Sequence, residues 1–333
     1  MKLLVIGGTR FVGRHIVDAA LARGASVTIF NRGQSAPAPA GVAQLRGDRN
    51  GDLAALARGS WDAVIDTCGY LPAEVTRMAQ SLRGRVGCYL FISSVSVYAS
   101  AATPNSEGSA LGVIADTDTS VVDGRTYGPL KALCEAALHA SVGDAALVYR
   151  PGLVVGPHDS TQRFTYWPAR LARATAGDTV LAPGTPDAPV QFIDARDLAA
   201  FALHGLESGA RGVFNVVTEP GRMTMADVLG ACASAAGASV RFAWRDVAAL
   251  EALGLKPWSD LPLALPPTPD YRAFMQVDAR RVLAAGLTTR PLAQTVADTL
   301  AWYRSLPPEQ QAFDKAGLSS EREAAALAAL GTP

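Results

Sequence analysis

The stretch that decides the fold reads LLVIGGTRFVG, residues 3–13. It begins with an apolar run typical of a buried strand, and Gly7, Arg10 and Gly13 then occupy the three positions of a G-x-x-G-x-x-G turn. A glycine-rich turn between a strand and a helix points backbone N–H groups at a pyrophosphate. The same pattern also fits a tight turn without a ligand. The arginine at the middle position is the one departure from the motif.

Short apolar runs alternate with helical patterns through the first 150 residues. We expect strands at 3–6, 26–30, 43–46, 63–66, 88–93 and 146–149, with helices such as 13–23 and 73–82 between most of them. This alternation predicts an α/β fold with a Rossmann-type doubly wound parallel sheet. The rhythm weakens after residue 150, which indicates a smaller C-terminal substrate domain. Helical patterns return at 291–304 and 320–330.

Composition excludes several classes of function. The 30 basic residues balance 30 acidic ones and are scattered among them, so neither a nucleic-acid partner nor an anionic membrane is expected. The four cysteines form no C-x-x-C pair and no histidine lies at ligand spacing, so we expect no disulfide framework and no metal site. No run approaches the length of a transmembrane segment. A soluble cytoplasmic protein is the expectation.

The second expected strand ends at Asn31 and Arg32, without the carboxylate that usually binds the adenosine ribose. Arginine offers a planar charged fork to a 2′-phosphate, which an aspartate there would repel. We therefore place Arg10, Asn31 and Arg32 at the ribose and predict NADP(H) rather than NAD(H). The alternative is a pair of solvated surface arginines. Asp48, followed by Arg49, closes the third strand and is expected at the adenine.

A second motif follows the strand GCYLFISS, residues 87–94. Tyr127 and Lys131 are spaced i, i+4 and share one face of a helix, in which Pro129 is tolerated only within the first turn. A carbonyl reduction needs a proton donor, and a nearby ammonium lowers the pKa of a phenol toward neutrality. We therefore predict Tyr127 as acid/base, Lys131 as the group that tunes it, and Ser94 as the hydroxyl that orients the substrate oxygen. An exposed helix with an ordinary Tyr and Lys is the alternative.

Taken together and in this order, these motifs resemble the short-chain dehydrogenase/reductase superfamily. The likeness is to its extended and atypical branches, the NAD-dependent epimerase/dehydratase family. GGTRFVG is similar to the G-G-T-x-F-x-G variant of the branch that includes the chloroplast stem-loop-binding proteins, which implies cofactor contacts for Thr9, Phe11 and Val12. YRPGLVVGP (149–157) resembles the segment that packs on the nicotinamide ribose, which implies a contact for Pro151. Family resemblance also makes Lys131 a cofactor contact.

The resemblance implies a division of the chain. A dinucleotide-binding domain is expected at 1–155, with 193–218 returning to it. The substrate-binding domain is expected at 156–192 and 219–304, followed by a helical tail at 305–333. The protein is expected to be a monomer or a homodimer.

Two departures from the nucleotide-sugar members concern the substrate. Val190 stands where those members carry an arginine for the nucleotide phosphate, and Leu153 stands near where they carry an asparagine. A less charged small molecule is therefore expected, with Ser96, Arg163 and Tyr166 as candidate contacts. Aromatic residues that pack a second domain are the alternative for the stretch 158–167.

Three functions remain open from the sequence. The first is an NADP(H)-dependent oxidoreductase that reduces a carbonyl or oxidises an alcohol. The second is a sugar epimerase or dehydratase that retains its cofactor. The third is a member without turnover that senses nucleotides or binds RNA, against which the absence of a basic run argues.

Overall fold

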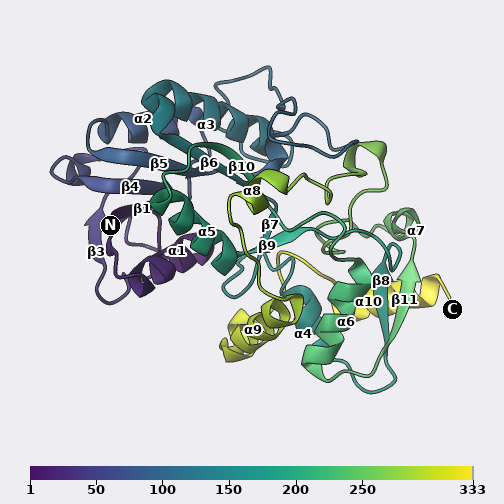
Figure 1. Cartoon of the computed structure of the whole chain (residues 1–333). Coiled ribbons are helices and arrows are strands. Elements are labelled where there is room, and N and C mark those ends of the chain that lie inside the picture. The colour runs from purple at the N-terminus through teal and green to yellow at the C-terminus, as the bar shows by residue number, and fades with distance from the viewer. Residues whose placement is uncertain (332–333) are drawn as a thin grey trace.

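A computed structural model describes residues 1–331 and contains a seven-stranded parallel sheet (Figure 1). The strands are β1 (Lys2–Ile6), β2 (Ser26–Asn31), β3 (Ala43–Arg46), β4 (Trp61–Asp66), β5 (Val86–Ile92), β6 (Ala146–Pro151) and β10 (Gly212–Val216). Their order is β10-β6-β5-β4-β1-β2-β3. The order reverses between β1 and β4, and in open α/β sheets ligands bind at that reversal, outside the carboxyl ends of the strands. The six strands expected from the sequence and the Rossmann-type sheet are confirmed.

Helices cover both faces of this sheet. α1 (Phe11–Ala22) and α5 (Ala195–Glu207) lie on one face, and α2 (Pro72–Ser81) and α3 (Tyr127–Val142) lie on the other (Figure 1). Successive side chains of a strand point to opposite faces, so β1 sends Leu3 toward α1 and Leu4 toward α2. Both leucines are fully buried, and each such burial stabilises the fold by about 1.5–3 kcal/mol.

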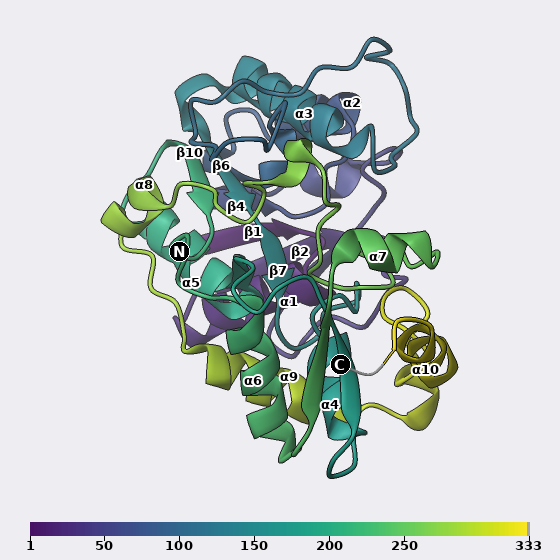
Figure 2. The same ribbon diagram turned by 90° about the vertical axis from the view of Figure 1, so that its right-hand side faces the viewer.

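The second part of the molecule is built from small sheets and helices. β7 (Leu153–Val155) pairs with β9 (Phe192–Asp194), and β8 (Thr179–Pro183) pairs with β11 (Arg241–Arg245). Its helices are α4 (Tyr166–Ala172), α6 (Met225–Ala236), α7 (Val247–Ala252), α9 (Leu292–Ser305) and α10 (Ser320–Ala329). Figure 2 shows α6 and α9 side by side, and these two helices contact each other. This part has its own apolar core around Trp167 and Phe164.

The segment after α9 is fastened to this second part. Glu323 of α10 accepts a hydrogen bond from Arg170 of α4 at 2.6 Å and another from the backbone N–H of Leu181 at 3.0 Å. Leu318 and Ala326 are buried against neighbours from residues 181–264. Positions 332–333 of the expected tail lie outside the described residues.

One expected boundary needs correction. The sequence assigns 219–304 to the substrate domain, whereas α8 (Arg280–Ala284) contacts β10, and Val277, Val282 and Leu287 are buried in the core that β1, α1 and α5 share. α8 has only five residues, so it carries too little hydrophobic periodicity to show which core it joins.

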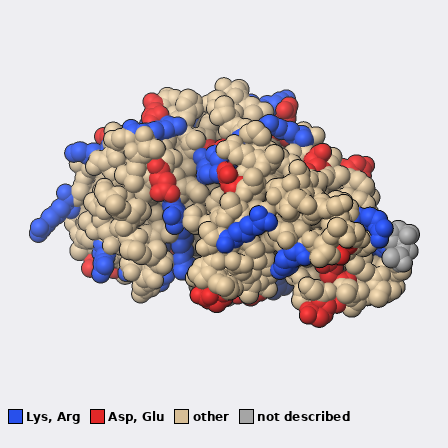
Figure 3. Space-filling view, turned by 90° about the horizontal axis from the view of Figure 1, so that it is seen from below, with Lys and Arg blue, Asp and Glu red and all other residues tan. Residues whose placement is uncertain are grey.

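The surface carries charges of both signs. On the face that Figure 3 shows, Lys and Arg are interspersed with Asp and Glu. Across residues 1–331, no helix is both long and apolar enough to cross a membrane. In the same part of the chain, no cluster of His, Cys, Asp and Glu is arranged to hold a metal ion.

A histidine pair lies where α1 meets the second part. The ring of His158 lies 5.7 Å from the ring of His15 and 5.3 Å from the indole of Trp302, measured between centroids. Burial, the charge of Arg14 and the charge of His15 lower the pKa of His158 to about 4. His158 is therefore neutral in the folded protein at neutral pH.

This histidine makes stability depend on pH. The unfolded chain protonates His158 with a pKa near 6.5 and the folded chain near 4, so the free energy of unfolding falls as pH drops between those values. Between about pH 7 and about pH 5, we expect the melting temperature of His158→Gln to fall less than that of the wild type. His139→Gln, at an exposed position of α3, is the control and should follow the wild type. Identical pH profiles for His158→Gln and the wild type would contradict the assignment.

Candidate functional site

The glycine loop lies after β1, at the reversal of strand order. Gly7 and Gly8 have φ of +102° and +88°, a region that side chains rarely adopt. Arg10, in contrast, is extended, with φ −129° and ψ 146°, and precedes the first residue of α1. A Cβ on Gly13 would lie 2.7 Å from the backbone nitrogen of Gly8. The outer glycines are thus required by conformation or by close packing, whereas the middle position accepts an arginine.

The ends of β2 and β3 lie beside this loop. The Asn31 amide donates to the carbonyl of Gly7 at 3.0 Å, and its oxygen accepts from the Gly33 N–H and the Gln44 amide at 2.9 Å. Asn31 therefore holds the loop against β3. Arg32 is exposed, as is Arg10 in the loop.

Neither Arg10 nor Arg32 makes a side-chain hydrogen bond or an ion pair within residues 1–331. Asp48 accepts a 2.9 Å hydrogen bond from the N–H of Asn50, which forms a tight turn after β3. Among the remaining predicted cofactor contacts, Thr9, Phe11 and Val12 lie in the loop and the first turn of α1, and Pro151 ends β6.

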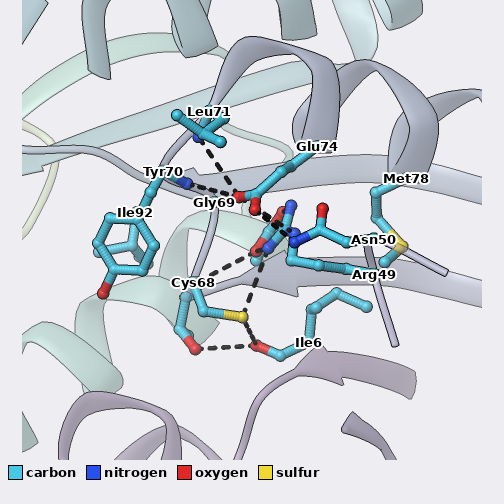
Figure 4. A network of polar contacts seen from close by, with 12 residues as sticks. Ile6, Arg49, Asn50, Cys68, Gly69, Tyr70, Leu71, Glu74, Met78 and Ile92 are labelled. Carbon is cyan, nitrogen blue, oxygen red and sulfur yellow. Dashed lines mark hydrogen bonds and ion pairs between the residues drawn. The ribbon is translucent and has the colours of Figure 1, made fainter. Parts of the chain in front are cut away.

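Arg49 lies in a buried polar network at the end of β4 (Figure 4). It donates to both oxygens of Asp66 at 3.0 Å, and its Nε lies 3.6 Å from Glu74 of α2. Burial raises the pKa of Asp66, but the charge and hydrogen bonds of Arg49 outweigh it and hold that pKa below its usual value. The guanidinium of Arg49 is therefore committed to Asp66, and a contact between Arg49 and the cofactor stays a prediction.

The serine and tyrosine of the second motif meet at the carboxyl edge of the sheet. Tyr127 is the first residue of α3, as the position of Pro129 predicts, and the Ser94 side chain is near enough to its phenol to act on the phenol's pKa. The Ser94 hydroxyl also donates to Ser96 at 3.1 Å. A Cβ on Gly128 would lie 2.1 Å from the carbonyl oxygen of Ser96. Only glycine at 128 lets the start of α3 approach the serine loop this closely.

The electrostatics of Tyr127 differ from the expectation. Burial raises the pKa of its phenol, and the opposing effects come from the Ser94 side chain and the charge of Arg163. Lys131 instead donates to the main-chain carbonyls of Gly69 and Ile92, at 2.9 Å and 2.7 Å. The predicted lowering of the Tyr127 pKa by Lys131 is therefore wrong for this structure. Burial lowers the pKa of Lys131 itself to about 8.

Tyr70 is a residue that the sequence analysis did not single out. It follows β4, and its ring centroid lies 6.5 Å from that of Tyr127 and 5.6 Å from the Lys131 ammonium. Burial of its phenol raises the Tyr70 pKa to about 12, although 44% of the residue remains accessible to solvent. Its position after β4, a strand at the reversal of strand order, is the sequence signal that could have identified Tyr70.

The predicted substrate residues separate into two environments. The guanidinium of Arg163 lies 5.2 Å from the Trp258 ring and interacts electrostatically with the Tyr127 phenol. Tyr166 is 2% exposed, and its ring packs against Trp167 and Phe313. The expectation that Tyr166 contacts substrate is therefore corrected. Phe313 is too distant in the sequence for a local pattern to reveal the packing.

An apolar hollow lies where the nucleotide-sugar members carry their arginine. Val190 lines it together with Met225, Leu263 and Tyr271, and its volume is about 420 Å³. The only charged lining residue within the described chain is Arg272. Such a hollow accepts an apolar group more readily than a phosphate.

The chain is similar to known proteins in sequence and in fold. A model of the NAD dependent epimerase/dehydratase family matches residues 3–217. The chloroplast stem-loop binding protein of 41 kDa b of Arabidopsis thaliana is 26% identical over 258 residues, which cover 71% of this chain and 63% of that protein. The chain thus spans less than two thirds of the length of this curated relative.

Two solved structures illustrate the likeness in fold. The enzyme WbmH of Bordetella bronchiseptica, in complex with NAD+, superposes with a TM-score of 0.67 at 17% identity, over 91% of this chain and 98% of that one. A human epimerase family protein, determined with NADPH, superposes with a TM-score of 0.60 at 22% identity, over 90% of this chain and 99% of that one. At identities this low, the superpositions show a common fold and nothing more specific.

Proposed function

Since the chain belongs to the NAD-dependent epimerase/dehydratase family, we propose that it is an NADP(H)-dependent oxidoreductase that interconverts a carbonyl and an alcohol on a small molecule. The observation that carries this proposal is the environment of Tyr127. Its phenol is buried at the carboxyl edge of the sheet, where the Ser94 side chain and the charge of Arg163 both act to lower its pKa. A proton donor, an orienting hydroxyl and a charge that stabilises a phenolate are the groups that a carbonyl reduction needs.

The loop beside this site suits a dinucleotide with a 2′-phosphate. The positive φ of Gly7 and Gly8 and the close packing at Gly13 make a turn from which backbone N–H groups can reach a pyrophosphate. Arg10 and Arg32 are exposed cations with free guanidinium groups within residues 1–331. We assign the 2′-phosphate to these two arginines. The WbmH structure contains NAD+ and the human one NADPH, so the neighbours include both cofactors.

The proposed roles follow from the pKa values. A bound nicotinamide supplies or accepts the hydride. Tyr127 is protonated near neutral pH because its pKa lies above the usual value, so it donates its proton to the oxygen of the substrate carbonyl during reduction. Ser94 donates a hydrogen bond to the same oxygen. Lys131 is assigned to the cofactor, since its ammonium lies at the sheet edge next to Gly69 and Ile92.

Titration with NADPH and NADH tests the cofactor assignment. For the wild type we expect tighter binding of NADPH, followed by nicotinamide fluorescence. Removing one charged partner of the 2′-phosphate in Arg32→Ala should weaken NADPH by about 1.5–3 kcal/mol, or about 10- to 100-fold, and leave NADH nearly unchanged. Arg83→Ala, another exposed arginine outside the loop, is the control. An unchanged NADPH/NADH ratio in Arg32→Ala would reject the clamp.

The same purified protein separates the proposal from its alternative. An epimerase or dehydratase of this family type oxidises and reduces its cofactor within one turnover, so the cofactor would remain bound through gel filtration. Exchangeable NADPH favours the oxidoreductase. Cofactor that co-purifies and resists exchange would instead favour an epimerase or dehydratase.

A further inference from the structure

Arg163 is a cation without a protein partner. Within residues 1–331 its guanidinium donates no hydrogen bond and forms no ion pair, and burial lowers its pKa. The other seven arginines that are buried or half-buried each donate at least one hydrogen bond to a carboxylate or a main-chain carbonyl. Partial burial of an unpaired charge is unfavourable, so this one is expected to be paired by a group from outside the chain.

The backbone before Arg163 is held in place by the C-terminal segment. Gln162 has φ +64°, in the left-handed region, and such residues persist only where their surroundings hold them. Its side-chain oxygen accepts from the N–H groups of Asp314 and Lys315 at 3.1 Å and 2.9 Å, and its amide donates to Ala312 at 2.8 Å. Residues 312–315 therefore hold the backbone next to Arg163 in place.

A second residue with a left-handed backbone conformation contacts the guanidinium of Arg163. Trp258 has φ +68°, and its N–H lies within hydrogen-bonding distance of the carbonyls of Leu261 and Ala264, at 3.1 Å and 3.0 Å. Its indole lies 5.2 Å from the Arg163 guanidinium carbon. An arginine against an aromatic ring keeps the N–H groups at its edge available for an anion.

No carboxylate of residues 1–331 forms an ion pair with Arg163, although Asp159 acts on its charge. Asp159 attracts Arg163 electrostatically but forms no ion pair with it within the described chain. Its Oδ1 accepts from the N–H and the hydroxyl of Thr161 at 2.8 Å and 2.7 Å, and burial raises its pKa. The charge of Arg163 also opposes the rise that burial causes in the pKa of Tyr127, so it acts on the proposed proton donor.

We propose that Arg163 binds an anionic oxygen group, a carboxylate or a phosphate, that the substrate carries close to its reacting carbon. The planar guanidinium matches both groups through paired hydrogen bonds. The inference rests on the proposed function for the identity of the reacting carbon, whereas the anion site itself is testable by binding alone. A single anionic group is consistent with Val190, which lines the apolar hollow at the position where the nucleotide-sugar members carry an arginine for the nucleotide phosphate.

A matched pair of probes tests this site by calorimetry on the protein, both with and without saturating NADPH. Benzoylformate carries a carboxylate beside a carbonyl, and its methyl ester has the same carbonyl without the charge. We expect the wild type to bind the acid at least tenfold more tightly than the ester. In Arg163→Gln the acid should weaken about 10- to 100-fold while the ester changes little. Arg163→Lys should lie between, because an ammonium keeps the charge without the fork.

Arg173→Gln is the control, because this exposed arginine also lies near an aromatic ring, 5.7 Å from Phe313. It should bind both probes as the wild type does. Inorganic phosphate is the third probe, and its competition with the acid would extend the site to phosphate esters. Equal affinity for acid and ester, an unchanged acid affinity in Arg163→Gln, or no binding of acid or phosphate at about 10 mM overturns the inference.

The outcomes separate this inference from the proposed function. If NADPH neither binds nor is oxidised, yet the acid binds through Arg163, the oxidoreductase assignment fails and the anion site stands. If neutral carbonyls are reduced with NADPH and the acid has no advantage, the oxidoreductase stands and the role of Arg163 fails.

Discussion

Tyr127→Phe is expected to reduce NADPH-dependent turnover about 10²- to 10⁴-fold, the usual contribution of a positioned proton donor. The change removes one hydroxyl and keeps the ring, so α3 and its contact with the serine loop should remain intact. NADPH affinity should therefore stay close to that of the wild type. Steady-state kinetics with a carbonyl substrate and the fluorescence titration measure the two quantities separately.

Tyr70→Phe is the matched control for this change. Tyr70 and Tyr127 have ring centroids 6.5 Å apart, and both have a raised phenol pKa. Within residues 1–331, the Ser94 side chain acts on the pKa of Tyr127 and not on that of Tyr70. Turnover within tenfold of the wild type in Tyr127→Phe would reject its role, and a large loss in Tyr70→Phe alone would move the proton donor to Tyr70.

Arg49→Met is expected to be the most destabilising single change among the charged residues near the site. It leaves Asp66, which is 0% exposed, as an unpaired carboxylate in the core. Breaking a buried ion pair by removing one partner costs about 3–5 kcal/mol. For a protein of this size that lowers the melting temperature on the order of 10 °C, measured by calorimetry.

Two further variants check the physical reason. Arg23→Met removes an exposed pair, whose side chains are 38% and 47% accessible, and should cost about 0–1 kcal/mol. Asp66→Asn in the Arg49→Met background removes the unpaired charge and should recover part of the loss. A melting temperature of Arg49→Met close to that of Arg23→Met would show that the buried network contributes little.

The fold was predictable because its signals are local. Most expected strands of the sheet are apolar runs, and the Gly7 and Gly13 turn joins the first strand to a helix, so periodicity and turn chemistry sufficed. The order of motifs was also enough to predict the epimerase/dehydratase family, which the family model confirms. The five residues of α8 carry no comparable local signal, and its core was misassigned.

The site was predictable only in part. Tyr127 begins α3 as the i, i+4 spacing and the proline indicate, and the Ser94 side chain acts on the pKa of its phenol. The cation that acts on the Tyr127 phenol was not predictable. Lys131 donates to the carbonyls of Gly69 and Ile92, whereas Arg163 belongs to a later segment outside the sheet.

By itself, therefore, the sequence determined the sheet, its glycine loop and the serine and tyrosine at its edge, since these depend on neighbours a few residues apart. Only the tertiary structure decided which charged groups form pairs and which side chains are buried. Arg49 pairs with Asp66 across 17 positions, Tyr166 is covered by Phe313, and Arg163 has no hydrogen-bond or ion-pair partner within residues 1–331. Electrostatic pairing and burial depend on distance in space, which local patterns of residues do not contain.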